Sequence, residues 1–400
     1  MSLYAYHNKQ GVLLMRMHPL HYLTVCLSVL LTHSALAVNA ESDSALILEE
    51  IVVTATRTEK PLGNAPGSVS YLSAEDLINE HLSRTIPEAL KVIPGVMVQK
   101  TAHGQGSPYI RGFTSMRTLF LIDGIRLNNS VFREGPNQYW NTVDPLSLDA
   151  LEIVKGPGSV LFGSDAVGGM VSAVTGRLAM NSPSPYLDVR SYLRVAGAEE
   201  SMIGRMAMEV GLGRRAAIRV GLSPKSFGDL RSGGELGTQP KTGYREFDGD
   251  VKAEVALSEN IRLVTAHQQV HQDDIWRTHK TIYGLSWEGT TVNDSTGSKY
   301  ELKRVLEQDR SLTYAQLHAE NFGILSDRFG LSVSYHHQSE VQERERVRRD
   351  AETGAKKLKP DEQGVSVGTF GCWVQNDKKT PLGLLTVGGD VYYDDVSSYK

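Results

Sequence analysis

The chain has 400 residues, with 42 basic and 46 acidic side chains and a formal net charge of −4. This acidic balance argues against nucleic acid as a partner, because such binding needs a basic face. No stretch approaches the roughly 18 consecutive apolar residues of a transmembrane helix, so a membrane-spanning form of this chain requires a closed β-barrel.

The N-terminus has the order of a secretory signal peptide. Lys9 and Arg16 precede an apolar run from Leu20 to Leu31, and small residues follow at Ala35–Ala37. A charged region, a short apolar core and an A-x-A site in this order predict cleavage after residue 37.

Cleavage there leaves 40 basic against 46 acidic residues and makes Cys372 the only cysteine, so no intrachain disulfide can form. Two alternatives stay open. The charged region is long, so Met15 or Met17 is an alternative start. Leu23–Cys26 weakly resembles a lipoprotein site, in which Val25 replaces the usual small residue.

Residues 38–48 are polar and without period, and we expect them to be disordered. Ile51–Thr54 then form a β-branched run that is too short to bury itself. One interpretation is an edge strand of the following domain. The other is a peptide that adds a strand to the sheet edge of a partner, and its place before the linker Pro61–Gly67 favours this second interpretation.

Two short helices are expected next. Ser73 is a suitable N-cap for a helix to about Leu82, with acidic residues in its first turn. Thr85 and Glu88 form a capping box for the second helix, which Pro94–Gly95 ends.

The pattern then predicts buried strands at Val96–Val98 and Leu119–Ile122, with a hairpin turn at Asp123–Gly124. Asp144–Pro145 begins another helical turn before a strand at Leu151. Together these elements predict a small α+β domain of roughly 130 residues with its own core.

The densest glycines lie in Leu151–Thr175, between the strand-like pieces Leu151–Val154 and Met170–Thr175. The backbone must turn sharply several times there, because glycine allows positive φ and close approach. A phosphate loop is disfavoured, since no Gly-Lys-Ser/Thr follows the glycines.

Four segments, in this order, resemble motifs of the plug domain of TonB-dependent outer-membrane receptors: Glu50–Arg57, Ile110–Phe113, Leu119–Arg126 and Glu152–Gly169. The last segment matches the family pattern almost position for position. With the signal peptide at 1–37, the resemblance divides the chain into a leader at 38–60, an α+β plug domain at 61–178 and the first part of an antiparallel transmembrane β-barrel at 179–400.

The residues after 185 support a barrel independently of the resemblance. Apolar and polar side chains alternate in segments of roughly ten residues, as in strands with one face to lipid and one to the lumen. The alternation is clearest at Leu187–Val195, Met202–Leu212, Ala216–Leu222 and Phe329–Tyr335.

The connections alternate in length as well. Short turns are expected at 212–215, 257–260, 321–327 and 376–381, and longer ones at 226–243, 274–298 and 347–363. Periplasmic turns and extracellular loops alternate in this way, although the first outer connection, near 196–201, is shorter than expected. About nine strands fit, whereas the family fold has about 22, so we expect the chain to be truncated.

The resemblance implies roles for two sets of residues. The TonB box, which pairs with the C-terminal domain of periplasmic TonB, would be Glu50, Ile51, Val52, Val53, Thr54 and Ala55. Arg111 and Lys155 match two basic plug positions that pair with carboxylates of the barrel wall, although relatives more often have arginine at the second position. A solvated cation at Lys155 is the alternative.

Ligand contacts in the family come from outward plug apices and outer loops. By position, the candidates in this chain are His103, Tyr109, Arg117, Arg133, Gln138, Tyr139 and Trp140. Some of them would instead pack the apex against the barrel wall.

Other sites find less support. His267 and His271 are four residues apart in a strand, about 13 Å, so they cannot share one metal ion. A haem ligand among His267, His271, His279, His336 and His337 stays open beside the interpretation as lumen-lining residues. We expect no enzyme, metal site or cofactor, since no nucleophile motif or zinc-type spacing occurs, and a β-barrel hydrolase is the enzymatic alternative.

The resemblance therefore implies TonB-dependent active transport across the outer membrane of a Gram-negative-type bacterium. The expected partners are TonB, outer-membrane lipid and a small-molecule ligand. A ferric siderophore leads as substrate, with haem, cobalamin or another metal chelate as alternatives. A passive plugged porin and a non-transporting surface receptor are the alternative functions.

Overall fold

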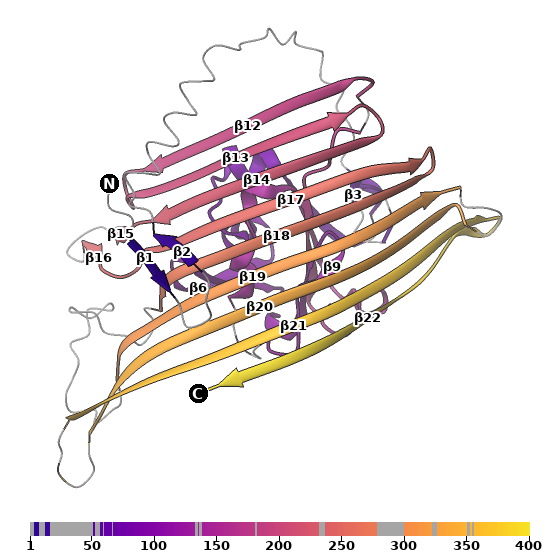
Figure 1. The fold of residues 1–400 in the computed structure, drawn as a ribbon. Helices are drawn as coiled ribbons and strands as arrows, with labels where there is room; N and C mark the ends of the chain where they lie inside the picture. Colours follow the sequence, from indigo (N-terminus) through magenta and orange to yellow (C-terminus); the bar gives the residue numbers. More distant parts are fainter. Residues whose placement is uncertain are drawn as a thin grey trace. The chain divides into compact units, whose positions relative to one another are not determined.

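A computed structural model of the chain describes residues 4–7, 13–16, 51–52, 57–58, 60–65, 67–132, 135, 138–180, 182–231, 237–277, 300–321, 326–349, 353 and 356–400. These residues divide into two units, 1–49 and 50–400 (Figure 1). The first unit contains an antiparallel hairpin of β1, Tyr4–His7, and β2, Leu13–Arg16. The apolar run and the cleavage site of the expected signal peptide lie outside the described residues, and the signal peptide stays a prediction.

The second unit begins with a short strand pair. β3, Ile51–Val52, is antiparallel to β4, Lys60–Pro61. This pair forms a sheet of its own, separate from the sheet of the α+β domain, so β3 is not an edge strand of that domain. The remaining residues of the expected TonB box lie outside the described ones.

The α+β domain is built on a mixed five-stranded sheet in the order β5-β10-β11-β8-β9. The glycine-rich segment connects its two central antiparallel strands through the short helix α3, and β11 is parallel to β8. The elements are β5, Ser68–Ser73; β8, Thr118–Ile122; β9, Ile125–Arg126; β10, Leu148–Lys155; α3, Ser159–Phe162; and β11, Gly169–Thr175.

The predicted helix starts are confirmed by side-chain hydrogen bonds. Ser73 Oγ and Asp76 bond reciprocally at the start of η2, Asp76–Glu80, with Ser73 N 2.7 Å from the Asp76 carboxylate. Thr85 caps α2, Ile86–Ala89, and accepts a hydrogen bond from Glu88 N. The 3₁₀-helix η3, Leu90–Val92, follows α2, and these satisfied N–H groups fix where each short helix begins.

Both predicted strands are present, but only one of them is buried. All five residues of β8 are buried, and the turn at Asp123–Gly124 has both φ angles positive, as a tight two-residue hairpin requires. By contrast, β6, Val96–Ala102, pairs only with β7, Gln105–Ile110, in a separate hairpin. Met97 is 59% exposed, so the prediction of a buried strand at Val96–Val98 was wrong, because apolar composition alone does not show whether a second layer covers a strand.

Four 3₁₀-helices complete the domain: η1, Leu62–Asn64; η4, Ser115–Arg117; η5, Tyr139–Thr142; and η6, Pro145–Ser147. The domain core lies between the sheet, these short helices and the neighbouring long strands. Phe120, Trp140 and Leu151 are fully buried in it, and the rings of Phe120 and Trp140 lie 4.6 Å apart. Val264, Ala266 and Leu312 of the long strands belong to the same cluster, so the core is continuous across the two parts of this unit.

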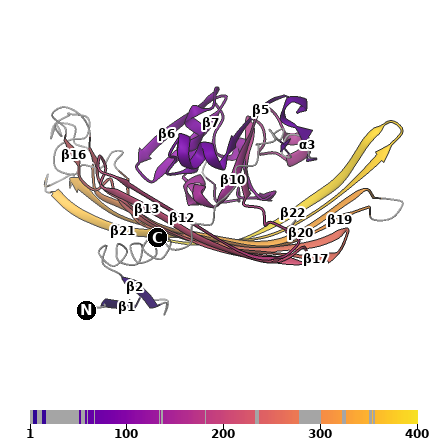
Figure 2. The same ribbon diagram turned by 90° about the horizontal axis from the view of Figure 1, so that it is seen from above.

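The rest of the unit is one antiparallel sheet of nine strands, which confirms the expected number for the described residues. The chain enters neighbouring strands in order and the sheet is curved (Figures 1 and 2). Its strands are β12, Pro185–Ala196; β13, Ser201–Leu212; β14, Ala216–Phe227; β17, Tyr244–Ser258; β18, Ile261–Trp276; β19, Tyr300–Glu320; β20, Arg328–Arg349; β21, Lys356–Thr380; and β22, Gly383–Tyr399. A small pair, β15, Leu230–Arg231, and β16, Thr238–Gln239, lies between β14 and β17.

Most predicted connections agree with the strand ends. Two corrections concern β21, which is longer at both ends than the sequence predicted. Residues 356–363 belong to this strand instead of the long connection 347–363, and residues 376–380 belong to it instead of a turn. The charged side chains in these ranges suggested loops, yet a strand whose ends extend into water carries them without penalty.

The two faces of the sheet differ as the alternation predicted. The α+β domain lies against the concave face (Figure 2), and the convex face carries exposed apolar side chains such as Leu187, Met208, Val220, Tyr335 and Val391. Within the described residues, every helix is too short or too polar to cross a membrane.

Phe120→Ala tests the core of the α+β domain. We expect a loss of about 3–5 kcal/mol in unfolding free energy, because the ring is fully buried against Trp140. Thermal unfolding of the protein in detergent measures the effect. Val160→Ala is the matched control, because Val160 is fully exposed and its loss should leave the midpoint unchanged. Equal shifts in the two variants would contradict the assignment of the core.

Candidate functional site

The α+β domain is fastened to the concave face of the sheet at Asp144. This residue caps η6 by accepting a hydrogen bond from Leu146 N. Its carboxylate also lies 2.8 Å from Lys225 Nζ, 3.3 Å from an Arg205 nitrogen and 2.6 Å from Ser223 Oγ. One side chain therefore joins a helical turn of the domain to two strands of the sheet.

The sheet surrounds this contact with more buried charge. Lys225 Nζ is also 2.6 Å from both Glu246 and Asp248, and Arg205 is 2.8 Å from Asp250. We call the six residues Asp144, Arg205, Ser223, Lys225, Glu246 and Asp248 the Asp144 latch. Burial alone would raise the pKa of Asp144, but the charges of Lys225 and Arg205 outweigh it and hold the pKa below the usual range.

Main-chain carbonyls beside Asp144 are held as well. Gln272 Nε2 donates to Asn141 O at 3.1 Å, and Arg310 Nε donates to Thr142 O at 2.6 Å. The sequence analysis predicted only a capping role for Asp144, because the cations that pair with it lie 61 and 81 positions further along the chain. The only sign of these partners in the sequence was that Arg205 and Lys225 occupy polar positions of strands with alternating polar and apolar residues.

A second contact lies at the hairpin turn between β8 and β9. Tyr314 Oη donates to the Asp123 carboxylate at 2.6 Å, and Gln316 Nε2 donates to Asp123 O at 2.9 Å. The same carboxylate accepts a hydrogen bond from Thr175 Oγ1, which in turn accepts one from Lys252 Nζ. This network ties the turn to the end of β11 and to the sheet.

A third contact involves Arg57, at the start of the domain. Its guanidinium lies 4.2 Å above the ring of Phe162 and 3.1 Å from the carboxylate of Asp390 on β22, while Gln375 donates to Arg57 O. The segment that follows the expected TonB box is thus attached both to the domain and to the sheet.

Arg111 and Lys155, which were expected to pair with carboxylates of the barrel wall, take no part in these three contacts. Arg111 is exposed at the start of a turn with φ of 52°, and Lys155 Nζ donates to Ser70 Oγ at 3.0 Å within the same domain. Among the described residues, neither forms a salt bridge with a carboxylate of the sheet. Their pairing stays a prediction, whereas the contacts that the structure shows are those of Asp144, Asp123 and Arg57.

Three of the expected ligand residues lie in the interior. Trp140 and Tyr139 belong to the domain core, where the Tyr139 ring stacks on Phe132 at 4.9 Å, and Gln138 is also buried. These side chains offer a ligand almost no surface in this arrangement. Aromatic and amide side chains suit ligand contact and core packing equally well, so only the packing in the structure distinguishes these two roles.

His103 lies at the apex of the β6–β7 hairpin and is also buried. Its ring sits edge-on against Phe227 at 5.5 Å and Tyr244 at 5.9 Å, with Nε2 3.7 Å from the Glu199 carboxylate. Burial, followed by the charge of Arg84, lowers the pKa of His103 from 6.5 to about 3. The histidine is therefore neutral at physiological pH and clamps the apex between aromatic rings of β14 and β17.

The remaining ligand candidates are more accessible. Arg117 is exposed beside the start of β8, and Tyr109 is half-buried with its hydroxyl donating to Gln99 at 2.8 Å. Arg133 lies outside the described residues. The assignment of all seven candidates to ligand contact stays a prediction.

The histidines of the sheet are separated by its faces. His267 and His271 lie on the convex face, where His267 Nδ1 is 2.8 Å from Thr313 Oγ1 and His271 Nδ1 is 2.7 Å from Asp309. His336 is buried on the concave face. His279 lies outside the described residues. Although the sequence indicated no metal site, His271, Glu307 and Asp309 bring ligand atoms within 4.8 Å of one another at the surface.

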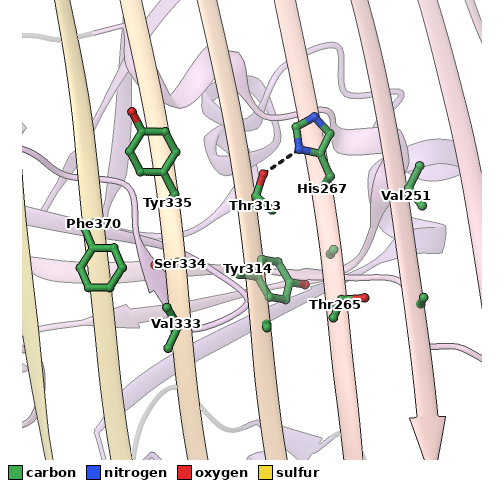
Figure 3. Close-up of a pocket in the computed structure, with 12 residues that line it drawn as sticks. Val251, Thr265, His267, Thr313, Tyr314, Val333, Ser334, Tyr335 and Phe370 are labelled. Carbon is green, nitrogen blue, oxygen red and sulfur yellow. Dashed lines mark hydrogen bonds between the residues drawn. The ribbon is translucent and has the colours of Figure 1, made fainter.

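A shallow apolar groove crosses the convex face (Figure 3). It has a volume of about 530 Å³ and its lining includes Val251, His267, Thr313, Tyr335 and Phe370. The side chains project from adjacent strands on the side away from the α+β domain, so the groove is separate from the Asp144 latch.

Comparison with known proteins identifies the domain. Residues 61–170 match the family model "TonB-dependent Receptor Plug Domain". The chain is 35% identical over 130 residues to a protein named vitamin B12 transporter BtuB from Vibrio vulnificus, covering 32% of this chain and 20% of the relative. It is 37% identical over 158 residues to the iron-regulated outer membrane virulence protein of Vibrio cholerae, covering 38% and 23%.

Solved structures extend the likeness to the sheet. The copper transporter OprC matches with a TM-score of 0.64 at 16% identity, over 82% of this chain and 46% of that one. A mutant of the ferric enterobactin receptor PfeA from Pseudomonas aeruginosa matches with a TM-score of 0.59 at 18% identity, over 87% and 51%. At these identities the likeness shows the fold.

The chain is a TonB-dependent receptor. Its α+β domain is the plug, its nine long strands correspond to barrel strands of the family, and it belongs to the outer membrane of Gram-negative bacteria. The convex face is accordingly the lipid face and the concave face is the lumenal wall. The chain spans about a fifth of the length of these curated relatives and about half the length of the solved structures.

Substitutions in the latch should have graded effects. Asp144→Asn removes the negative charge that the plug contributes to the latch but leaves Lys225 and Arg205 paired within the wall. We therefore expect the free energy that holds the plug on the wall to fall by about 1.5–3 kcal/mol. Lys225→Met leaves buried carboxylates without their cation and should cost more, about 3–5 kcal/mol.

Hydrogen exchange of residues 138–150 in the intact protein measures both effects. Asp188→Asn is the control, because Asp188 forms an exposed pair with Arg190 and should change little. A larger effect from Asp144→Asn than from Lys225→Met would contradict this account of the latch.

The His103 clamp should weaken in acid. Because the folded pKa lies below the unfolded value of 6.5, the stabilisation is complete above that value and is lost progressively as the pH falls toward about 3. The pKa of Glu88 is also lowered, from an ordinary value of 4.5, so its contribution declines only at lower pH.

Between pH 6.5 and 4.5 the change in stability should therefore come from His103 and not from Glu88. His103→Phe should retain the aromatic packing and flatten the dependence of hydrogen exchange at residues 96–110 across this interval. His81→Gln is the control, since His81 is an exposed plug residue. An unchanged pH dependence in His103→Phe would rule out the clamp as its source.

Proposed function

We propose that this protein takes up a small-molecule ligand across the outer membrane in a TonB-dependent manner. The observation that supports this most directly is a plug domain seated on the lumenal wall and joined to it by the Asp144 latch. A barrel closed in this way needs a driven rearrangement before a solute can pass. The outer membrane has no ATP or ion gradient of its own, so the drive must come from the periplasmic side.

The segment before the plug is suited to receive that drive. β3 forms main-chain pairs with β4 over only two residues, so a partner strand can replace β4 at little cost. The plug is next attached at Arg57, through Asp390 and Gln375 of the wall. Tension on the TonB box, Glu50–Ala55, would therefore act first on the Arg57 contact and then on the plug core.

The polar nature of the plug–wall contacts supports a movable plug. The latch, the Asp123 contact and the Arg57 contact are hydrogen bonds and ion pairs, which water can replace as they open. The plug also shares apolar side chains with the wall at Val264, Ala266 and Leu312, and separating these would expose hydrocarbon surface to water. These contacts would thus hold the plug in the absence of force and open when TonB pulls on the TonB box.

The ligand is proposed to be a scarce nutrient, with a ferric siderophore foremost. The relatives are named as a vitamin B12 transporter, an iron-regulated protein, a copper transporter and a ferric enterobactin receptor. Haem, cobalamin and other metal chelates therefore remain alternatives. The other proposed partners are the C-terminal domain of TonB and outer-membrane lipid, and we assign no enzymatic activity.

Val52→Pro tests the transport function. Proline lacks the N–H group that a strand needs for pairing, so TonB-dependent uptake should be lost while surface binding of the ligand is retained. The measurement is growth rescue and ligand uptake in an iron-starved host that lacks its own receptors, with siderophores, haem and cobalamin offered in parallel. Val52→Thr keeps a β-branched residue with its N–H group and should transport normally.

Uptake that persists in Val52→Pro would favour a passive plugged porin. Binding without uptake in the unmodified protein would favour a non-transporting surface receptor.

A further inference from the structure

The convex face carries a group of metal-ligating side chains toward its outer end. His271 on β18 lies directly opposite Asp309 on β19, and Glu307 follows two residues along β19 on the same face. His271 Nδ1 is 2.7 Å from Asp309 Oδ1. One ligand atom from each of the three side chains lies within 4.8 Å of the other two. An imidazole and two carboxylates from adjacent strands therefore converge on one point of the surface.

A β-bulge lies beside this group. The register between β18 and β19 shifts between Gln272 and Ile275, where Asp274 has a positive φ of 58°. Bulges bend a strand and re-aim the side chains around them. Asp273, within the bulge, has Oδ1 3.7 Å from His271 Nε2. Both ring nitrogens of His271 thus face carboxylates, one on each strand.

Glu307 and Asp309 have no other contact that would explain their positions. Among the described residues, Asp309 is paired only with His271, and Glu307 forms neither a hydrogen bond nor a salt bridge. Two carboxylates this close repel each other, and a cation between them removes the repulsion. Their arrangement is therefore the one expected of ligands around a bound ion.

The donor atoms indicate the class of ion. Imidazole nitrogen with carboxylate oxygen is a common ligand set for Zn²⁺ and for other divalent transition metals. Ca²⁺ instead takes six to eight oxygen ligands, whereas one of the three side chains here offers nitrogen. The set favours a transition metal over Ca²⁺.

The group lies on the outside of the barrel wall. His271 is the strand partner of Phe247, which is exposed on the convex face together with Tyr335 and Phe370. Exposed aromatic side chains of this kind mark the boundary between lipid and water. The sheet separates the group from the plug, which lies against the concave face (Figure 2). An ion at this point would be outside the path of a transported ligand.

We infer that His271, Glu307 and Asp309 bind a divalent transition metal ion of the Zn²⁺ class. The ion joins β18 to β19 near the end at which the long connection between them leaves the sheet. Because it binds the folded protein and not the separated strands, it stabilises the wall at the membrane boundary. This site is independent of the proposed transport function.

The test is metal binding to the intact protein in detergent, with no affinity tag and after treatment with a chelator. Zn²⁺ is titrated calorimetrically, and Co²⁺ serves as a spectroscopic probe because its visible absorption reports nitrogen and oxygen ligands. We expect one saturable site and a thermal unfolding midpoint that rises with Zn²⁺. The same concentration of Ca²⁺ should leave the midpoint unchanged.

H271Q, E307Q and D309N should each weaken Zn²⁺ binding by about tenfold or more. E307Q is the sharpest of the three variants. Glu307 has no partner among the described residues in the absence of the ion, so the metal-free unfolding midpoint of E307Q should match that of the unmodified protein.

Two further histidine variants are matched controls. H267Q removes an exposed imidazole of the same strand whose partner is Thr313 (Figure 3). H81Q removes the imidazole from Asp76, Glu80 and His81, the other group of possible ligands in the described part of the plug. Both variants should bind Zn²⁺ and Co²⁺ as the unmodified protein does.

Absence of Zn²⁺ binding, or binding that E307Q leaves unchanged, would overturn the inference and leave His271 and Asp309 as an ion pair only. Loss of binding in H81Q but not in H271Q would place the ion on the plug and equally overturn it. Equal affinities for Ca²⁺ and Zn²⁺ would contradict the assigned class of ion.

Discussion

The burial of charge between two parts of one chain is the constraint on which this structure depends. The Asp144 carboxylate can be buried only because Lys225 and Arg205 lie within 3.3 Å of it. Those cations are themselves paired with carboxylates of the wall. Burying any one of these charges alone would cost a large desolvation free energy, which the neighbouring opposite charges offset. This polar network and the apolar core that the two parts share together hold the plug on the wall.

The same alternation of side chains serves two environments. On the convex face, exposed apolar residues such as Met208 and Val220 suit the lipid of the outer membrane, while the concave face carries the residues that hold the plug. A shift of one residue in strand register would exchange these faces and bury the wrong set. The register of β13, β14 and β17 thus fixes both the membrane surface and the latch, because Arg205, Lys225 and Glu246 come from these three strands.

The contacts of the plug are of two kinds, those within its interior and those that attach it to the wall. The interior of the plug is apolar, and its attachment to the wall combines polar contacts at Asp144, Asp123 and Arg57 with apolar side chains that both parts share. Breaking a polar contact in the presence of water costs less than exposing a core.

The sequence by itself determined the local elements and the family. Ser73 and Thr85 fix helix starts by accepting hydrogen bonds from nearby backbone N–H groups, and Asp123–Gly124 fixes a hairpin. The glycine-rich segment identifies the plug, and period 2 predicts the strands and their number. These features depend on residues close together in the chain. Strand ends were less certain, as the extension of β21 shows, because charged residues at a strand end and in a loop look alike.

Only the tertiary structure decided which side chains hold the plug and which are buried in it. Trp140 and His103 had the character of ligand residues, yet Phe120 occupies one side of Trp140, and Phe227 and Tyr244 enclose His103. The partners of Asp144 lie far along the chain and on two different strands. Their meeting depends on the curvature and register of the sheet, which no local pattern records, so the chemistry of the wall became visible only once the strands were placed side by side.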